Sequence, residues 1–272
     1  MKISVIIPSF NREKYLPIAI NSIKDQTYHI DEIIIIDDGS TDNTQKILNK
    51  IDNIKTIKTK NLGVSHARNI GIKASKNNWV AFLDSDDIWI QDKIEKQVNF
   101  HKKNQNILFS HTGERWIRDG KRVKYPKSLK KPQGECFLQN ISTCKIAASS
   151  VLMHKSIFDD IGYFDEKLKV CEDYDLWLRV TQKYTIGLMY EELIIKNAGH
   201  KQLSTSIFAI DRYHIYSLQK LLNSKFKNEI QEEIVRKCNI LIKGAKKHQN
   251  QKILELYSKM IRNIECQILP EP

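Results

Sequence analysis

The stretch EIIIIDDGSTDNT, residues 32–44, joins a strand pattern to a helix pattern across one polar turn. Its four consecutive isoleucines are typical of a strand that is buried on both faces. The polar residues that follow favour a turn, and Ser40, Thr41 and Asp42 are suitable N-caps for the next helix. A strand that passes through a short polar loop into a helix is the repeating unit of α/β folds.

The same unit recurs on both sides of this stretch. Strand patterns lie at 3–7, 54–57 and 80–83, and helix patterns lie at 16–23 and from about residue 64. This alternation predicts a parallel sheet with helices on both faces. In such sheets ligands bind beyond the carboxyl ends of the strands.

Three of the predicted strands end in polar loops. These loops are PSFNR (8–12), DDGSTD (37–42) and DSDD (84–87). Because the carboxyl ends of parallel strands lie at the same edge of a sheet, we expect the three loops to converge there. The residues alone therefore predict where a ligand binds.

The third loop holds three carboxylates, Asp84, Asp86 and Asp87, and no Lys or Arg. Like charges this close repel each other, and they lose solvent at a strand end. A divalent cation removes that repulsion, and Mg²⁺ and Mn²⁺ prefer hard oxygen ligands. The alternative is a turn with an acidic N-cap, since Asp is common in both roles.

The rest of the chain has weaker patterns. Residues 107–111 and 151–154 predict strands, and the polar, basic residues 113–135 predict a loop. CEDYDLWLRV (171–180) predicts a helix whose first turn is acidic, which suits the positive end of a helix dipole. Residues 207–264 predict basic helices, from apolar residues three or four apart.

Composition places the chain among ordinary globular proteins. It has 272 residues, of which 41% are hydrophobic and 28% charged. Five irregularly spaced cysteines without a C-x-x-C pair indicate neither a zinc site nor a disulfide framework. No apolar run is long enough to span a bilayer, and MKISVIIPSF is not typical of a secretory signal, so we expect a cytoplasmic protein.

The net charge of +12 is spread unevenly. Residues 115–131 hold eight Lys/Arg and one acid, Asp119. Such a basic segment suits an anionic surface, which is nucleic acid, acidic lipid or a phosphorylated substrate, and the alternative is a solvated loop. Since no nucleic-acid-recognition motif accompanies the charge, we expect no nucleic-acid partner.

The motifs, taken together and in order, resemble a known family. The pattern VIIPSFNR, INSIKDQTY, EIIIIDDGSTDNT, NLGVSHARNIGI, VAFLDSDDIW and CEDYDLWLRV is similar to family 2 glycosyltransferases with the GT-A fold, over about residues 3–206. The resemblance implies a Rossmann-like, nucleotide-binding mixed sheet flanked by helices. It also implies a catalytic domain at 1–206, followed by a C-terminal helical extension at 207–272.

The resemblance assigns donor-binding residues by motif. The set is Pro8, Ser9, Phe10, Asn11 and Arg12 in the base loop, Asp38 as base reader, Arg68 towards the base and phosphates, and Asp84 and Ser85 towards the ribose. Asp84 is alternatively bound to the metal through water, and Asp37 orients the loop. Stacking of Phe10 on the base would contribute about 1–3 kcal/mol, and the alternative for Phe10 is a core residue.

The resemblance also assigns the metal and the chemistry. It implies Mn²⁺ or Mg²⁺ at Asp86, with His200 at the metal or pyrophosphate. An inverting transfer needs one carboxylate to take the proton from the acceptor hydroxyl, and Asp173 matches that base, with Glu172 beside it. The alternative for this pair is two acids that decorate a helix N-terminus. We expect Trp177, one turn further, to be a core residue.

The implied activity is the transfer of a sugar from a nucleoside diphosphate donor, by default UDP, to a hydroxyl of a glycan or lipid-linked acceptor for a cell surface. The absence of a Q-x-x-R-W motif and of membrane helices disfavours a processive synthase. The basic segment and the C-terminal helices suggest peripheral contact with an anionic membrane, and the apolar faces of those helices permit a homodimer.

Other protein classes share parts of the pattern. A haloacid-dehalogenase-type phosphatase would use Asp84 as nucleophile, but its motif normally follows the first strand of the domain. A sugar nucleotidyltransferase would carry a glycine-rich loop that PSFNREKY lacks. A non-catalytic nucleotide-sugar-binding protein would not need Asp173.

Overall fold

The structure is a computed structural model that describes residues 1–124, 129–198 and 207–268. The strands are β1 (Ile3–Ser9), β2 (Glu32–Asp37), β3 (Lys55–Lys58), β4 (Trp79–Phe82), β5 (Asp87–Trp89), β6 (Phe109–Arg118), β7 (Lys121–Val123), β8 (Leu152–His154) and β9 (Gly187–Ala198). The helices are α1 (Leu16–Lys24), α2 (Thr44–Leu48), α3 (Val64–Ala74), α4 (Lys93–Lys103), α5 (Phe137–Asn140), α6 (Ser156–Ile161), α7 (Glu172–Lys183), α8 (Asp211–Gln219), α9 (Lys227–Lys247) and α10 (Gln251–Ile268), with a short 3₁₀ turn at Ala148–Ser150.

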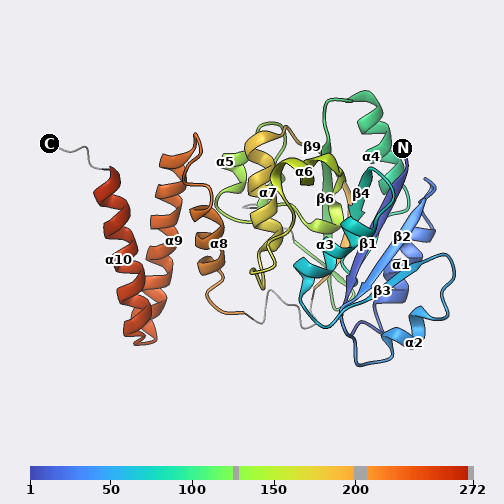
Figure 1. The fold of residues 1–272 in the computed structure, drawn as a ribbon, viewed down its shortest axis with the longest axis horizontal. Coiled ribbons are helices and arrows are strands. Elements are labelled where there is room, and N and C mark those ends of the chain that lie inside the picture. Colours follow the sequence, from blue (N-terminus) through green and yellow to red (C-terminus); the bar gives the residue numbers. More distant parts are fainter. Residues whose placement is uncertain (125–128, 199–206, 269–272) are drawn as a thin grey trace.

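The described strands form one mixed sheet, flanked by helices (Figure 1). Their order is β3-β2-β1-β4-β8-β6-β9-β5, and β7 pairs with β6. The first four strands are parallel, as the alternating pattern predicts. Beyond β4 the sheet turns antiparallel at β8, while β6 and β9 run parallel to each other. The mixed sheet that the resemblance implies is confirmed.

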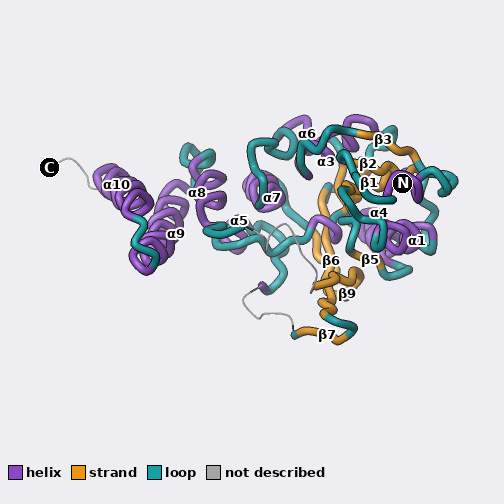
Figure 2. Tube along the Cα trace, turned by 90° about the horizontal axis from the view of Figure 1, so that it is seen from below, coloured by secondary structure: helices purple, strands orange, loops and turns teal. Residues whose placement is uncertain are grey.

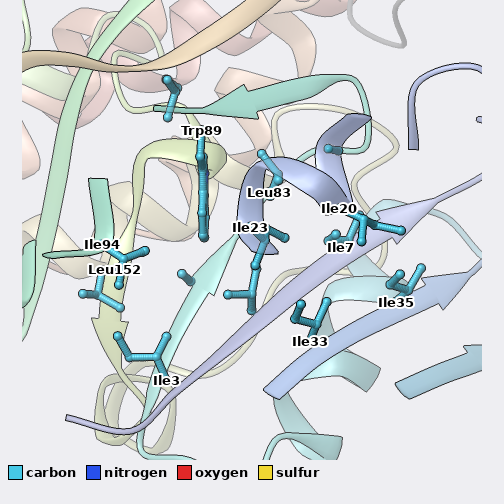
Figure 3. Packing of buried hydrophobic residues seen from close by; sticks show 14 of the residues in the cluster. Ile3, Ile7, Ile20, Ile23, Ile33, Ile35, Leu83, Trp89, Ile94 and Leu152 are labelled. Atoms are coloured by element: carbon cyan, nitrogen blue, oxygen red, sulfur yellow. The ribbon is translucent and has the colours of Figure 1, made fainter. Parts of the chain in front are cut away.

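The run of isoleucines in β2 is buried on both faces, because alternate side chains enter different cores. Ile33 and Ile35 pack in one cluster with α1 and α4, seen in close-up in Figure 3. Ile34 and Ile36 pack on the opposite face against Ala67 of α3. This double burial explains why the strand reads as a continuous apolar run rather than an alternating one.

One helix lies unusually close to the sheet. A Cβ atom at Gly71 in α3 would lie only 2.4 Å from Cγ2 of Ile6 in β1. The absence of a side chain at position 71 therefore lets α3 sit directly on β1. That close contact fixes the height of the α3 N-terminus above the edge where the strands end.

The predicted loop at 113–135 is partly wrong. β6 continues to Arg118, and the chain turns back at once into β7. Charged side chains are compatible with the end of this strand because its last four residues, 115–118, are only partly buried or exposed. β9 lacks a counterpart among the predicted elements, since its register with β6 shifts at Thr112 and Gly113 and blurs the period-two pattern.

The C-terminal helices extend the molecule away from the sheet (Figures 1 and 2). Their apolar residues, such as Ile230 and Ile234, form one cluster with Tyr174 and Leu178 of α7. Lys220, directly after α8, also donates to the buried carboxylate of Asp175 at 2.6 Å. The helical extension is therefore packed and ion-paired onto α7. Within the described residues no helix is long and apolar enough to cross a membrane.

Candidate functional site

A cavity of about 400 Å³ lies where the polar strand ends meet the N-termini of α3 and α7. It is lined by Pro8, Ser9, Phe10, Arg12, Asp38, Asn61, Gly63, Val64, Ala67, Arg68, Asp84, Ser85, Asp86, Val170, Cys171, Glu172, Asp173 and Lys196. The three loops predicted to converge on one edge of the sheet do so. Of the twelve predicted site residues that the structure describes, eleven line this one cavity and Asn11 does not.

The loop after β1 contributes an aromatic ring and a cation to the cavity. Phe10 is 38% exposed, so the alternative of a core residue is wrong. Asn11, which has a left-handed backbone with φ 52°, turns its side chain away from the cavity and accepts from the backbone of Thr41 at 2.7 Å. Asn11 therefore joins the first loop to the second instead of facing a ligand.

The loop after β2 is built around two aspartates. Asp37 accepts a hydrogen bond from the backbone N–H of Ser40, which closes the turn. Asp38 accepts from Thr59 Oγ1 at 2.6 Å and from the backbone N–H groups of Leu62 and Gly63. A carboxylate with three donors is held rigidly. Asp38 thus fixes the entry to α3 and still presents an edge to the cavity.

Arg68 of α3 connects two carboxylates that are far apart in sequence. Its guanidinium donates to Asp84 Oδ1 at 2.7 Å and to Glu172 Oε1 at 2.5 Å. The Arg68 side chain is 4% exposed, so these ion pairs are not surface salt bridges on α3. One buried cation therefore holds together the loop after β4 and the N-terminus of α7.

The ionisation of this group follows from burial and charge sharing. Burial, with a contribution from the neighbouring Asp173, raises the pKa of Glu172 to about 7 against the opposing effect of Arg68. Burial alone would raise the pKa of Asp84, but Arg68 and Lys196 lower it below the ordinary value. Arg68 is shared between the two acids, and Asp84, which also has Lys196 nearby, is the one of the pair whose pKa lies below its ordinary value.

The acidic turn at 84–87 is held from behind by groups on other elements. Ser149 accepts from the backbone N–H of Asp84 and donates to Asp87 Oδ2. Lys196 of β9 bonds the same Asp87 oxygen at 3.0 Å, and Asn197 donates to the backbone oxygen of Asp86. Burial raises the pKa of Asp87 to about 7, with Asp84 and Asp86 adding to the rise.

This bracing aims the Asp86 carboxylate at the cavity. Its side chain is 14% exposed, and the Arg12 guanidinium lies 3.9 Å from it. In the described residues no three His, Cys, Asp or Glu side chains come together as a metal cluster. An all-oxygen site with one or two carboxylates suits Mg²⁺ or Mn²⁺, which take their remaining ligands from water and substrate phosphates. His200 lies outside the described residues.

Two buried polar atoms of residues that line the cavity have no partner in the described part of the chain. Within the described residues, buried Ser9 Oγ and Arg68 Nε make no hydrogen bond. Buried polar atoms normally have a partner, so these two fit a polar ligand in the cavity. Both residues are on the side of the cavity formed by the parallel strands.

Asp173 sits in the first turn of α7, where backbone N–H groups point outwards. Its Oδ1 accepts from the N–H of Tyr174 at 2.7 Å, and the residue is partly exposed to the cavity. The preceding Cys171 adopts a left-handed conformation, φ 64°, which turns the chain sharply into the helix. Trp177 is 1% exposed, which confirms its assignment to the core.

Sequence reasoning missed Lys196, Ser149 and Asn197. Lys196 lines the cavity and neutralises Asp87, although 109 residues separate the two in the chain. The available signal was a lysine that ends the apolar run ELII in 192–195. That signal identifies a cation near the end of a strand, but only if residues 187–198 are first recognised as a strand.

The fold and the cavity define the class of protein: a GT-A sheet with an acidic site beyond its strand ends. The family described as "Glycosyl transferase family 2" matches residues 4–162, more than half of the chain. The chain belongs to this family.

Similar proteins in bacteria agree with this class. An uncharacterized glycosyltransferase of Rickettsia conorii is 41% identical over 197 residues, which cover 71% of this chain and 32% of the relative. The chain thus spans about a third of that relative's length. The Escherichia coli protein WfaP, named UDP-Glc:alpha-D-GlcNAc-diphosphoundecaprenol beta-1,3-glucosyltransferase, is 31% identical over 252 residues, covering 90% of this chain and 88% of WfaP.

A solved structure shares the fold. TarS 1-349 of S. aureus in complex with UDP-GlcNAc superposes with a TM-score of 0.72 at 22% identity, covering 88% of this chain and 72% of that one. At this identity the likeness supports the architecture alone.

Proposed function

We propose that this glycosyltransferase moves a sugar from a nucleoside diphosphate donor, most simply UDP-sugar, to a hydroxyl of a lipid-linked glycan precursor, with inversion at the anomeric carbon. The observation that carries the proposal is one cavity that holds a cavity-facing carboxylate after β4, Asp86, and a second at the α7 N-terminus, Asp173. An inverting transfer needs these two functions on opposite sides of the reacting carbon.

The donor assignment rests on the parallel half of the cavity and on relatives. Phe10 offers an exposed ring for the base, and Asp38 offers a fixed carboxylate edge. WfaP and WfgD of Escherichia coli are both named as UDP-Glc transferases, and TarS of S. aureus has been solved in complex with UDP-GlcNAc. These names support a uracil nucleotide for this chain as well.

A divalent metal fits the oxygen donors present. Asp86 would hold Mg²⁺ or Mn²⁺ directly, and Asp84 would hold it through water, with His200 a further proposed ligand. When bound, the ion supplies charge to the leaving diphosphate. Arg12 and Lys196 are the protein cations that face the same end of the cavity and add to that stabilisation.

The proposed chemical step is a single displacement. Asp173 accepts the proton of the acceptor hydroxyl while the oxygen forms its bond to the anomeric carbon. The bond from that carbon to the diphosphate oxygen breaks at the same time, and the nucleoside diphosphate leaves with the electron pair. The Tyr174 N–H fixes one oxygen of Asp173, and the carboxylate borders the cavity where the acceptor would bind. Glu172, paired with Arg68, positions the helix N-terminus.

The acceptor is proposed from relatives and charge. WfaP and WfgD are named for a GlcNAc-diphosphoundecaprenol acceptor, which is a lipid. Peripheral contact with an anionic membrane face, a cytoplasmic location and a homodimer through the C-terminal helices remain predictions. The family membership leaves the phosphatase and non-catalytic alternatives without support.

Calorimetry tests the donor and metal assignments together. UDP, GDP, dTDP and CMP are titrated into the protein with Mn²⁺ and then with EDTA, in wild type and Asp86→Ala. We expect metal-dependent binding of UDP that Asp86→Ala loses, while Asp92→Ala, on the same acidic stretch but outside the cavity, retains it. Binding of no nucleotide under either condition would overturn the proposal.

A further inference from the structure

Several cations of the basic segment 115–131 are paired with carboxylates in the folded protein. Arg115 and Arg122 both pair with Glu192 of β9. Lys131 is 11% exposed and pairs with the buried Glu114 at 2.8 Å. These partners neutralise part of the charge. Of the cations in the β6–β7 hairpin, Arg118 and Lys121 are exposed and have no acidic partner among the described contacts.

Strand register places those two cations beside the cavity. Trp116 of β6 pairs with Lys196 of β9, which in turn pairs with Asp87 of β5. Two residues further along the same strands, Arg118 pairs with Ala198 on one side and with Lys121 of β7 on the other. The hairpin therefore continues the sheet outwards from the acidic turn, at the free edge seen in Figure 2.

The two cations share a face with Lys196. Residues directly opposite each other, and residues two apart in one strand, point to the same side of a sheet. Arg118 and Lys121 thus lie on the side that carries Trp116 and Lys196, whereas Arg122 lies on the other. With about 4.8 Å between strands and about 3.4 Å per residue, the Cα atoms of Arg118 and Lys121 are roughly 8 and 12 Å from that of Lys196.

The surroundings place this face towards the acceptor side. Lys131 donates to the backbone oxygen of Lys145, next to Cys144. Burial raises the pKa of the Cys144 thiol, and the neighbouring Asp173 raises it further, so this segment adjoins the proposed base. The face of the hairpin that carries Arg118 and Lys121 therefore lies next to the cavity, on the side from which an acceptor would approach Asp173.

We propose that Arg118 and Lys121 bind the diphosphate of a sugar–diphosphate–lipid acceptor, while the sugar hydroxyl points to Asp173. The inference rests on the proposed function and names the feature of the acceptor that the enzyme reads. A diphosphate attached to the acceptor sugar lies about one sugar length from the attacking hydroxyl, which matches a cation pair just outside the cavity. Guanidinium and ammonium groups form strong, charge-assisted hydrogen bonds to phosphate oxygens.

The experiment compares two soluble probes that differ only in the phosphates. One is an α-N-acetylglucosaminyl diphosphate with a decyl tail, and the other is decyl α-N-acetylglucosaminide. Both are titrated into the full chain with UDP and Mg²⁺ present, in wild type, in R118Q, K121Q and R118Q/K121Q, and in the control R122Q. The control removes a cation from the same hairpin on its opposite face.

We expect wild type to bind the diphosphate probe about ten-fold more tightly than the phosphate-free one, as charge-assisted contacts allow. The double variant should lose this preference, each single variant should lose part of it, and R122Q should keep it. All variants should bind UDP as wild type does. No preference in wild type, no binding of either probe, or equal losses in R122Q and R118Q/K121Q would each overturn the proposal.

A second measurement distinguishes binding of the acceptor's diphosphate from binding to an anionic membrane surface. Sedimentation with phosphatidylcholine vesicles, with and without phosphatidylglycerol, is measured for the same proteins. If R118Q/K121Q loses vesicle binding but keeps the probe preference, the hairpin is a membrane surface and the inference is wrong. UDP binding without a probe preference overturns the inference alone, whereas a failure to bind UDP overturns the proposed function.

Discussion

The two halves of the sheet hold their charges in different ways. In the parallel half, loop carboxylates bind backbone N–H groups a few residues or one loop away, as Asp37 does with Ser40 and Asp38 with Gly63. In the mixed half beyond β4, charges are neutralised between strands far apart in sequence, as in Asp87 with Lys196 and Arg115 with Glu192. The proposed donor side is therefore held by contacts between nearby loops, whereas the proposed acceptor side depends on contacts between distant segments.

The largest expected effect is on the transfer rate, from a substitution of the proposed base Asp173, which lies where the two halves meet. Asp173→Asn keeps the shape of the side chain but cannot accept the hydroxyl proton. We expect the transfer rate to fall by about 10²–10⁴-fold, with UDP affinity unchanged. Single-turnover kinetics with calorimetry in parallel measures both, and the exposed Asp160→Asn serves as control. Unchanged turnover would remove Asp173 from the chemistry.

The next effect tests long-range pairing itself. Lys196→Met leaves the buried Asp87 carboxylate without its cation, and breaking a buried ion pair in this way costs about 3–5 kcal/mol. Urea unfolding should show that loss, and Asp87→Asn in the same chain should recover most of it. If the double variant is as unstable as Lys196→Met, the pair does not hold the acidic turn.

A smaller effect is expected on the donor side. Phe10→Ala should weaken UDP binding by about 1–3 kcal/mol if the ring stacks on the base. Because Phe10 is exposed, the urea midpoint should stay that of wild type. Ile18→Ala, which removes an exposed side chain from α1, controls for surface truncation. Equal UDP affinity in wild type and Phe10→Ala would place the base elsewhere.

The smallest effect is a pH dependence at the junction. Burial raises the folded-state pKa of Glu172 to about 7, above its ordinary 4.5. The folded protein therefore binds this proton more tightly, so the stability that it contributes is full below pH 4.5 and is lost as pH rises to about 7. Glu172→Gln removes this titrating carboxyl, and all other titrating groups are the same in the variant and in wild type. Its stability relative to wild type should rise between pH 5 and pH 8 in urea unfolding, and a flat difference would contradict the shift.

The contrast between the halves also decides what the sequence reveals. The strand–loop–helix units up to β4 repeat within about thirty residues, so periodicity and turn chemistry predict them together with Asp38, Asp84 and Asp86. The extent of β6 and all of β9 depend on pairing between segments some 80 residues apart, where a bulge breaks the period. Lys196 was not predicted as a site residue for the same reason, since only the register of β9 with β5 brings it to Asp87.

Arg68 shows the limit of assigning a role by motif. The resemblance places it at the base and phosphates, and the structure shows it bound to Asp84 and Glu172. Its partner Glu172 is 104 residues away, and no local pattern could reveal that contact. Local signals thus identified a residue of the site but not its contacts.

Helix α7 belongs to two cores at once. Leu176 and Trp177 pack in the cluster under the sheet, while Tyr174 and Leu178 pack with the C-terminal helices. The same twelve-residue helix carries Asp173 at its first turn. For protein engineering, the C-terminal helices are consequently not an interchangeable cassette: a graft from a relative must bring its own version of the α7 surface, or the proposed base will shift with the mismatch.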